Sequence, residues 1–370
     1  MRPTTTVSTS TGVRSCRNGG RLLCGIALML AALHSAAIET PADRWQKAAR
    51  AGADHLVRTL LPNGRFVYLQ RPLSGPPPAK YNWLRHCGAA YALWQAYDHF
   101  GDAAYRNAGA LALKEVRQTA LQRVRIDGRP FLVLVSDPEI TNSNPDQGPV
   151  VKTGGAALAL AAMLTAGRAG HGPPVPPPAE ELAAYLIHVT APDGTVRSKY
   201  LLRDNRYSSW QSDYYPGEAA YALALLEQAS PDPRQRRTVA RILLRTFAPW
   251  RQGPLPPDAR EPLDHWGLLA LEAAAPFLTD DLLRDVHTGP LQTGIASRPA
   301  LMAAAAAMVQ TELERQCPPG HPAAGSFRRR EALLAPTAIR IEGILAFGRL
   351  LARGAGLPGG TGIVLENRIR

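Results

Sequence analysis

A repeating order of segments runs along most of this 370-residue chain and restricts what it can fold into. An amphipathic helical segment comes first, a turn with Asn-Gly or Asp-Gly follows, and a helix of small apolar residues completes the unit. In the first unit these parts lie at residues 43–61, 63–64 and 85–100. Periodicity of this kind is typical of architectures in which one helical hairpin is repeated.

Six apolar helices are expected, and each follows a helix with a single apolar face. They lie at residues 85–100, 152–167, 214–228, 263–277, 296–313 and 337–354. A helix that is apolar on all sides is buried, whereas a helix with one apolar face covers it from outside. The sequence therefore predicts an all-α fold, an (α/α)6 toroid of six helical hairpins, with short β-hairpins on the active-site face.

The N-terminal segment indicates export. Arg14, Arg17 and Arg21 precede an apolar run at residues 22–33, and small residues follow it. This order is typical of a secretory signal peptide, and the run is shorter than the roughly 20 residues that span a bilayer. We expect a signal peptide at residues 1–37, a single toroid domain at residues 38–370, a secreted or periplasmic location, and no stable membrane insertion after cleavage.

The formal net charge of +12 predicts a basic surface, which attracts polyanions without choosing among them. The basic residues are dispersed and no nucleic-acid-binding motif occurs, so a nucleic-acid partner is not expected. The histidines lack metal-ligand spacing, and no phosphate loop or nucleophile elbow is present. We therefore expect no metal and no cofactor. Cys87 and Cys317 remain after cleavage, and both are expected to be unpaired and largely buried.

Polar residues gather at the start of five of the six apolar helices, where packing alone does not require them. Asp213 and Asp264 are of a type that caps helix starts, and the positive end of a helix favours anions in any case. Capping does not explain why basic, histidine and aromatic side chains gather at the same ends. If the inner helices run parallel, these starts surround one cleft.

Such a cleft suits glycoside hydrolysis, which needs two carboxyl groups on either side of a sugar ring. Asp213, Glu218 and Asp264 are the predicted catalytic carboxylates, and Tyr215, His86 and His265 are predicted proton carriers. The predicted substrate-binding residues are Arg85, Lys152, Tyr81, Asn82, Tyr214, Trp210, Trp266, Arg340 and Glu342. Arg340 and Glu342 cannot share a helix face, so one of them is expected to face the cleft while the other braces a neighbouring helix.

Two other functions remain open. A uronate lyase or C5-epimerase would use basic groups to neutralise the substrate carboxylate, and Tyr or His to move protons. A non-catalytic polysaccharide-binding protein of the cell envelope would need the aromatic residues but not the carboxylates. In each case the expected partner is a polysaccharide or oligosaccharide, neutral or anionic, and the sequence predicts no oligomeric state.

The helix starts RHCGAAYAL, KTGGAALAL, YYPGEAAYALALL and DHWGLLALE, spaced over six hairpins, resemble the six-hairpin glycosidase-like superfamily. The likeness covers almost all of the mature chain and is architectural. It implies a carbohydrate-active enzyme, because that group includes glycoside hydrolases, uronate lyases, uronyl epimerases and sugar 2-epimerases. It assigns no catalytic role to a particular residue. Hydrolysis is the reaction that we expect first.

Overall fold

The structure is a computed structural model that describes residues 40–68, 80–256, 259, 263–287, 293–327 and 334–354. Contacts divide the chain into two compact units, Met1–Ala51 and Gly52–Arg370. Almost all described residues belong to the second unit, to which the following description applies. The predicted signal peptide lies outside the described residues. Within the described part of the chain, no helix has the length and apolar character needed to cross a membrane.

Helices make up most of the described chain. They are α2 (Pro41–Thr59), α3 (Trp83–Phe100), α4 (Ala103–Glu115), α5 (Thr153–Arg168), α6 (Pro178–His188), α7 (Tyr215–Ala229), α8 (Pro233–Phe247), α9 (His265–Ala274), α10 (Asp280–His287), α11 (Arg298–Glu314) and α12 (Leu334–Ala352). Three short helical turns are η1 (Val116–Ala120), η2 (Pro145–Gln147) and η3 (Ala248–Trp250).

A small antiparallel sheet accompanies the helices. Its strands pair in chain order and are β1 (Leu121–Ile126), β2 (Arg129–Ser136), β3 (Val150–Lys152), β4 (Lys199–Leu201) and β5 (Arg206–Tyr207). Strand β3 runs directly into α5, so the sheet lies at the end where that inner helix begins. The sequence predicts short β-hairpins in this position.

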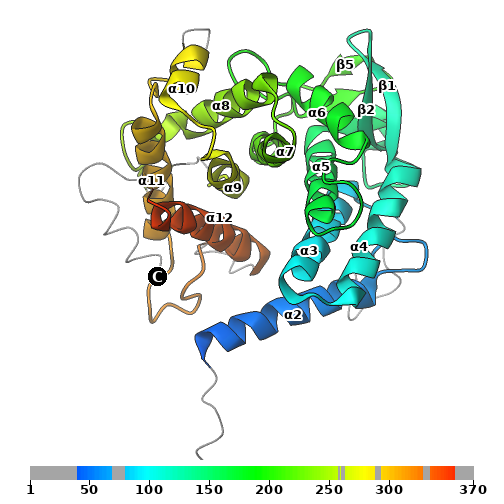
Figure 1. The fold of residues 1–370 in the computed structure, drawn as a ribbon, viewed down its shortest axis with the longest axis horizontal. Helices are drawn as coiled ribbons and strands as arrows, with labels where there is room; N and C mark the ends of the chain where they lie inside the picture. The colour runs from blue at the N-terminus through cyan, green and yellow to red at the C-terminus, as the bar shows by residue number, and fades with distance from the viewer. Residues whose placement is uncertain are drawn as a thin grey trace, which may run out of the picture. The chain divides into compact units, whose positions relative to one another are not determined.

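The apolar helices α3, α5, α7, α9 and α12 form a row in chain order (Figure 1). Helix α3 packs on α5, α5 on α7, α7 on α9, and α9 on α12. Helix α5 is buried on all sides, with only Arg168 at its end left exposed. Helices α4, α6 and α8 pack against the row as covering helices, and α8 turns its charged face outward. The alternation of inner and outer helices predicted from the sequence is thus present.

Helix α11 differs from its expected place. The sequence suggests an inner helix, yet α11 packs mainly against α8 and η3 and only slightly against α12. Most of its residues are buried all the same, in keeping with its run of alanines. An apolar surface on every side indicates that a helix is buried, but it does not say which neighbours bury it.

The Asx-Gly turns hold successive hairpins together. Gly64 and Gly194 both have a positive φ, which suits glycine. A Cβ atom at Gly64 would collide with the backbone of Leu111 on α4, and one at Gly194 with the backbone of Arg241 on α8. These two turns therefore pack on a covering helix farther along the chain, and this close contact requires glycine at both positions. Gly128, in the turn between β1 and β2, also has a positive φ, but a Cβ atom there would meet nothing within 4 Å.

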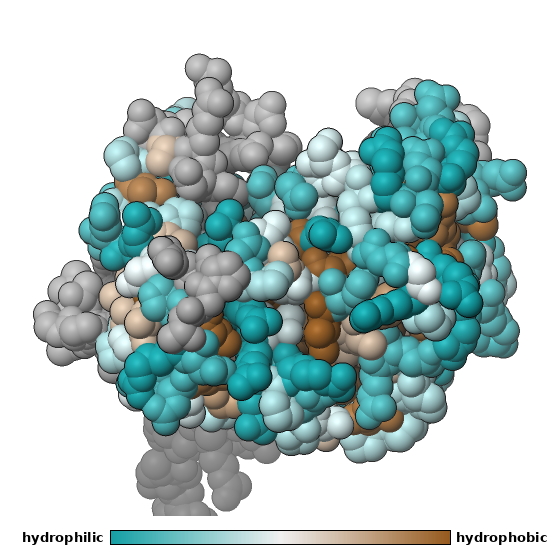
Figure 2. All heavy atoms as spheres, turned by 90° about the horizontal axis from the view of Figure 1, so that it is seen from above, coloured by the Kyte–Doolittle hydropathy of each residue, from teal (hydrophilic) through white to brown (hydrophobic). Residues whose placement is uncertain are grey.

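Large apolar side chains are concentrated in the interior, where Trp83, Trp94 and Phe347 are almost fully buried. Hydrophilic side chains cover most of the face seen in Figure 2, and hydrophobic ones show between them in small patches. Cys87 and Cys317 are buried and unpaired, which confirms the prediction for these two thiols.

Candidate active site

The first turns of α5, α7 and α9 meet at two glycines. A side chain at Gly154 of α5 would collide with the carboxyl group of Glu218 on α7. A side chain at Gly217 of α7 would likewise collide with the carboxyl group of Asp264 at the start of α9. Glycine at both positions lets the helices approach closely enough for their polar first turns to share one location. The expected gathering of helix starts is therefore observed for these three helices.

Glu218 is buried in the first turn of α7, and its Oε2 atom has no hydrogen-bond partner among the described residues. Burial, and then the charge of Asp264, raise the pKa of Glu218 to about 8. At neutral pH its carboxyl group therefore carries a proton that it can donate. Burial, and then the charge of Glu218, also raise the pKa of the Cys87 thiol, which places α3 beside the same carboxyl group.

Asp264 caps α9 and links it to α7. Its Oδ1 atom accepts the backbone N–H of Gly267 at 3.1 Å. Burial raises the pKa of Asp264 to about 7, although backbone N–H groups of Gly267, Trp266 and Gly217 act to lower it. Capping therefore accounts for the position of this residue. Its charge nevertheless acts on Glu218, so it influences the protonation of the neighbouring carboxyl group.

Asp213 is the exposed member of the carboxylate group. It does not cap α7, because Tyr214 occupies the cap position of that helix. Together with Asp264 it lines a pocket of about 270 Å³, whose other walls include Trp250 and Met308. The charge of Asp213 contributes to the raised pKa of Asp264, after burial. Three carboxyl groups thus act on one another in series, from the exposed Asp213 to the buried Glu218.

His265 is the first residue of α9 and is buried, and its Nδ1 atom has no hydrogen-bond partner within the described chain. Burial, and then the charge of Arg340, lower the pKa of His265 to about 4. The imidazole is therefore neutral at neutral pH. The ring of Tyr214 lies 5.8 Å from it, measured between centroids, so a phenol and a neutral imidazole stand together at this helix start.

A basic and aromatic group borders the carboxylates. Lys152 and Lys199 lie opposite each other on β3 and β4. The Lys199 amine is 4.6 Å from the ring centroid of Trp210, and that ring is 5.8 Å from the ring of Tyr215. Sequence reasoning selected Lys152, Trp210 and Tyr215 but missed Lys199. The signal for it was non-local, since the pairing of two strands brings Lys199 to the helix start.

On α12, Arg340 and Glu342 have different surroundings. Arg340 is buried, forms an ion pair with Glu312 of α11, and donates to the carbonyl oxygen of Pro336. It therefore braces α11. The charge of Glu342 adds to the raised pKa values of Tyr91 and Tyr221, which burial raises first. Glu342 thus faces the interior of the row. The sequence predicts this division, in which one of the two residues faces inward and the other braces a neighbouring helix.

The aromatic residues near Glu342 form a cluster deeper in the same row. The hydroxyl oxygens of Tyr91 and Tyr221 are 2.7 Å apart. The ring of Trp266 lies 6.2 Å from the ring of Tyr91 and 5.7 Å from that of Tyr221. Trp266, predicted to bind substrate, therefore packs in the first turn of α9 against side chains of α3 and α7.

His86 belongs to the core and has no ring nitrogen left for proton transfer. The Tyr81 hydroxyl accepts the backbone N–H of Phe66 and donates to His86 Nδ1, each at 2.8 Å. Nε2 of His86 then donates to the carbonyl oxygen of Ala112 at 2.9 Å. The structure therefore gives His86 and Tyr81 a structural role and does not bring them to the carboxylates.

Asn82 and Arg85 also serve the local structure of α3. The Asn82 side chain caps the helix by accepting the backbone N–H of Arg85 at 3.2 Å. The guanidinium of Arg85 is exposed and lies 5.2 Å from the ring centroid of Tyr68. No contact between these residues and the carboxylate group is present in the described part of the chain.

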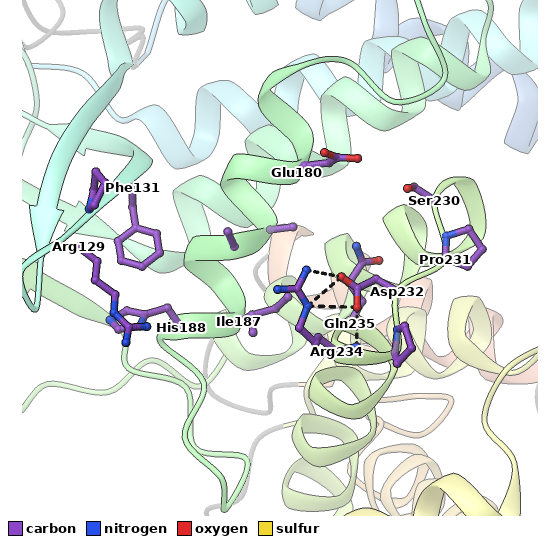
Figure 3. A pocket seen from close by; sticks show the side chains of 14 residues that line it. Arg129, Phe131, Glu180, Ile187, His188, Ser230, Pro231, Asp232, Arg234 and Gln235 are labelled. Carbon is purple, nitrogen blue, oxygen red and sulfur yellow. Dashed lines mark hydrogen bonds and ion pairs between the residues drawn. The ribbon is translucent and has the colours of Figure 1, made fainter.

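A second pocket, shown in Figure 3, lies between α6 and α8 and has a volume of about 700 Å³. Arg234 and Asp232 on its α8 side neutralise each other through a contact of 2.7 Å. Glu180 projects from the α6 side. None of the predicted site residues lines this pocket. The described residues also contain no group of three or more His, Cys, Asp or Glu side chains arranged to hold a metal ion.

Comparisons with known proteins place the fold. No family model and no curated protein matches the chain. Cellobiose 2-epimerase from Spirochaeta thermophila DSM 6192 matches with a TM-score of 0.56 and 12% identity, over 88% of this chain and 83% of that one. D-mannose isomerase matches with a TM-score of 0.52 and 12% identity, over 90% of this chain and 85% of that one. The α-1,6-mannanase GH76A from Salegentibacter sp. HEL1_6 matches with a TM-score of 0.39 and 13% identity, over 88% of this chain and 98% of that one.

The first two of these matches agree with the layered helices described above. The chain therefore has an α/α-toroid fold, as its sequence predicts, although α11 lies outside the inner row that it was expected to join. At this level of identity the likeness concerns the fold, and the function has to be argued from the residues at the helix starts.

Proposed function

We propose that this protein is an exported carbohydrate-active enzyme that hydrolyses glycosidic bonds at the starts of α5, α7 and α9. The observation that supports this best is the buried carboxyl group of Glu218, whose Oε2 atom has no hydrogen-bond partner among the described residues and which stands beside the carboxyl group of Asp264. A protonated and an ionised carboxyl group in one site are what glycoside hydrolysis requires. The predicted signal peptide supports export.

In this proposal Glu218 is the general acid. As the bond between the anomeric carbon and the leaving oxygen breaks, the Glu218 proton passes to that oxygen. The exposed carboxylate of Asp213 takes a proton from the water that adds to the anomeric carbon. Proton exchange with solvent then restores both groups. Asp264 maintains the raised pKa of Glu218 and holds the two helix starts together.

A second candidate is proton transfer at a sugar carbon, in an epimerase, isomerase or lyase. The neutral imidazole of His265 favours it, because its Nδ1 atom has no partner among the described residues and Tyr214 stands beside it. A neutral imidazole can accept a proton from carbon, and a phenol can return one. The carboxylate group would then orient the substrate instead of cleaving it.

One set of assays separates these functions. The purified protein is incubated with neutral and anionic polysaccharides, and reducing ends, ultraviolet absorbance and sugar stereochemistry are followed in parallel. Hydrolysis yields reducing ends without a double bond, elimination yields an absorbing product, and epimerisation changes stereochemistry alone. Binding without any product would indicate a non-catalytic polysaccharide-binding protein.

Substitution then tests the general acid. Glu218→Gln should lower turnover by about 10²–10⁴-fold, because the amide cannot supply the proton. Glu180→Gln removes a carboxyl group from the pocket of Figure 3 and serves as the matched control, which should keep full turnover. Full activity of the Glu218 variant would rule out the hydrolytic role. Loss of activity in His265→Asn with Glu218→Gln unaffected would establish the second candidate instead.

A further inference from the structure

We infer that Lys152, Lys199 and Trp210 form a subsite for a sugar residue that carries an anionic group. This inference rests on the proposed function and names its substrate class, an acidic polysaccharide or oligosaccharide. Its three residues come from β3, β4 and the loop before α7; strand pairing brings the two lysines together, and Lys199 contacts the ring of Trp210.

The two lysines make an unbalanced pair of charges. They lie directly opposite each other on antiparallel strands, where like charges repel. Both are half-buried, which weakens the screening of that repulsion by water. Neither ammonium group has an ion-pair or hydrogen-bond partner among the described residues. An anion bound between them would relieve the repulsion and supply the missing hydrogen-bond acceptors.

Trp210 supplies a flat surface beside the lysines. Its side chain is 48% exposed, which is unusual for so large an aromatic residue. Its loop is held in place, because the Trp210 backbone N–H donates to Ser208 Oγ at 3.1 Å and that of Ser212 to Ser198 Oγ at 2.9 Å. An ordered, exposed indole beside the Lys199 ammonium can stack on the apolar face of a sugar, while Lys199 and Lys152 on the paired strand bind its charged substituent.

The subsite adjoins the proposed catalytic carboxyl group. The ring of Tyr215 lies 5.8 Å from Trp210, and the charge of Glu218 adds to the raised pKa of Tyr215, which burial raises first. Gly154 contacts both Tyr215 and Glu218. Only one aromatic ring therefore separates the lysine and tryptophan group from the general acid. An acidic sugar bound there would place the adjoining linkage toward Glu218.

A binding experiment tests the subsite independently of turnover. The full-length chain with Glu218→Gln is titrated calorimetrically, at low salt, with a tetramer of galacturonic acid and with the same tetramer fully methyl-esterified. The acidic form should bind at least about tenfold more tightly, since two charge-assisted contacts are available to it alone. Added Lys152→Gln and Lys199→Gln substitutions should abolish that difference, and Lys152→Arg with Lys199→Arg should largely keep it.

Trp210→Ala should weaken binding of both tetramers by roughly fivefold or more, because the stacking surface serves each. Equal affinity of the two tetramers for the parent protein would overturn the inference, whatever the variants show. Inorganic sulfate that binds as tightly as the acidic tetramer, without dependence on Trp210, would also overturn it. Lysine-dependent binding of the acidic tetramer with no turnover by wild-type protein would leave the subsite standing and contradict the proposed function. Turnover of neutral glycans with no preference for acidic ones would leave the proposed function standing and contradict the subsite.

Discussion

The polar side chains near the start of α3 and on α12 differ from those at the starts of α7 and α9 in how they are bonded. At α3 both ring nitrogens of His86 are hydrogen-bonded, and on α12 Arg340 pairs with Glu312. At α7 and α9 one carboxyl oxygen of Glu218 and one ring nitrogen of His265 have no partner in the described part of the chain. A buried polar atom without a partner costs stability, so it indicates a place where chemistry outweighs packing. A polar residue at a helix start does not indicate this by itself.

The largest loss of stability should come from replacing His86, both of whose ring nitrogens are hydrogen-bonded. His86→Ala leaves the hydroxyl of Tyr81 and the carbonyl of Ala112 without their partner in the core, and it creates a cavity. We expect the free energy of unfolding to fall by about 3–5 kcal/mol. Urea denaturation measures this loss, and the turnover of the protein that remains folded should be unchanged.

His265→Ala is the matched variant for this experiment. It removes a ring with an unbonded nitrogen, so it should cost less stability than His86→Ala and should affect turnover or binding instead. If His86→Ala proved stable but inactive, the distinction between helix starts whose polar side chains are hydrogen-bonded and those whose side chains lack a partner would be wrong.

A second effect concerns pH and stability. The pKa of Glu218 is raised from 4.5 to about 8, so its contribution to stability is complete below about pH 4.5 and is lost as pH rises through about 8. In Glu218→Gln this loss cannot occur. The difference in unfolding free energy between variant and wild type should therefore move in favour of the variant from pH 5 to pH 8, by on the order of a few kcal/mol.

Taking this difference between the two proteins cancels the opposite contribution of His86 and His265. Their pKa values are lowered to about 4, so their contribution is lost as pH falls. Thermal or urea unfolding at several pH values provides the data. Parallel pH profiles for the two proteins would show that Glu218 is ionised at neutral pH.

Much of the fold, but less of the site, could be predicted from the sequence. The helix period and the Asx-Gly turns report local geometry, and they predicted the alternating layers. His86 and His265 look alike by the same criterion, since each stands in the first turn of an apolar helix. What distinguishes them is the carbonyl of Ala112, 26 residues from His86, which meets it only after α3 packs on α4. Lys199 was missed for a similar reason, because strand pairing brings it beside Lys152.

A smaller loss of stability is expected on α12, where Arg340 forms an ion pair. Arg340→Met breaks the buried ion pair with Glu312, but Arg315 still contacts that carboxylate at 3.2 Å. The loss of stability should therefore be about 1–3 kcal/mol, less than when a buried charge loses its only partner. Arg349→Met, at a more exposed pair with Glu272, is the control and should cost about 1 kcal/mol or less. A larger loss in the control would contradict this ranking of the pairs.

The smallest expected effect is a change of binding affinity with pH at the start of α5, where Lys152 stands. Burial, and then the charge of Lys199, lower the pKa of Lys152 to about 8, so Lys152 loses its positive charge as pH rises from 7 to 9. Affinity for an acidic tetrasaccharide should fall several-fold over that range, since a charge-assisted contact becomes a neutral one. In Lys152→Arg the charge persists, and the affinity should stay nearly constant. If wild type and variant declined equally, another group would carry the titration and Lys152 would belong with the residues that serve structure alone.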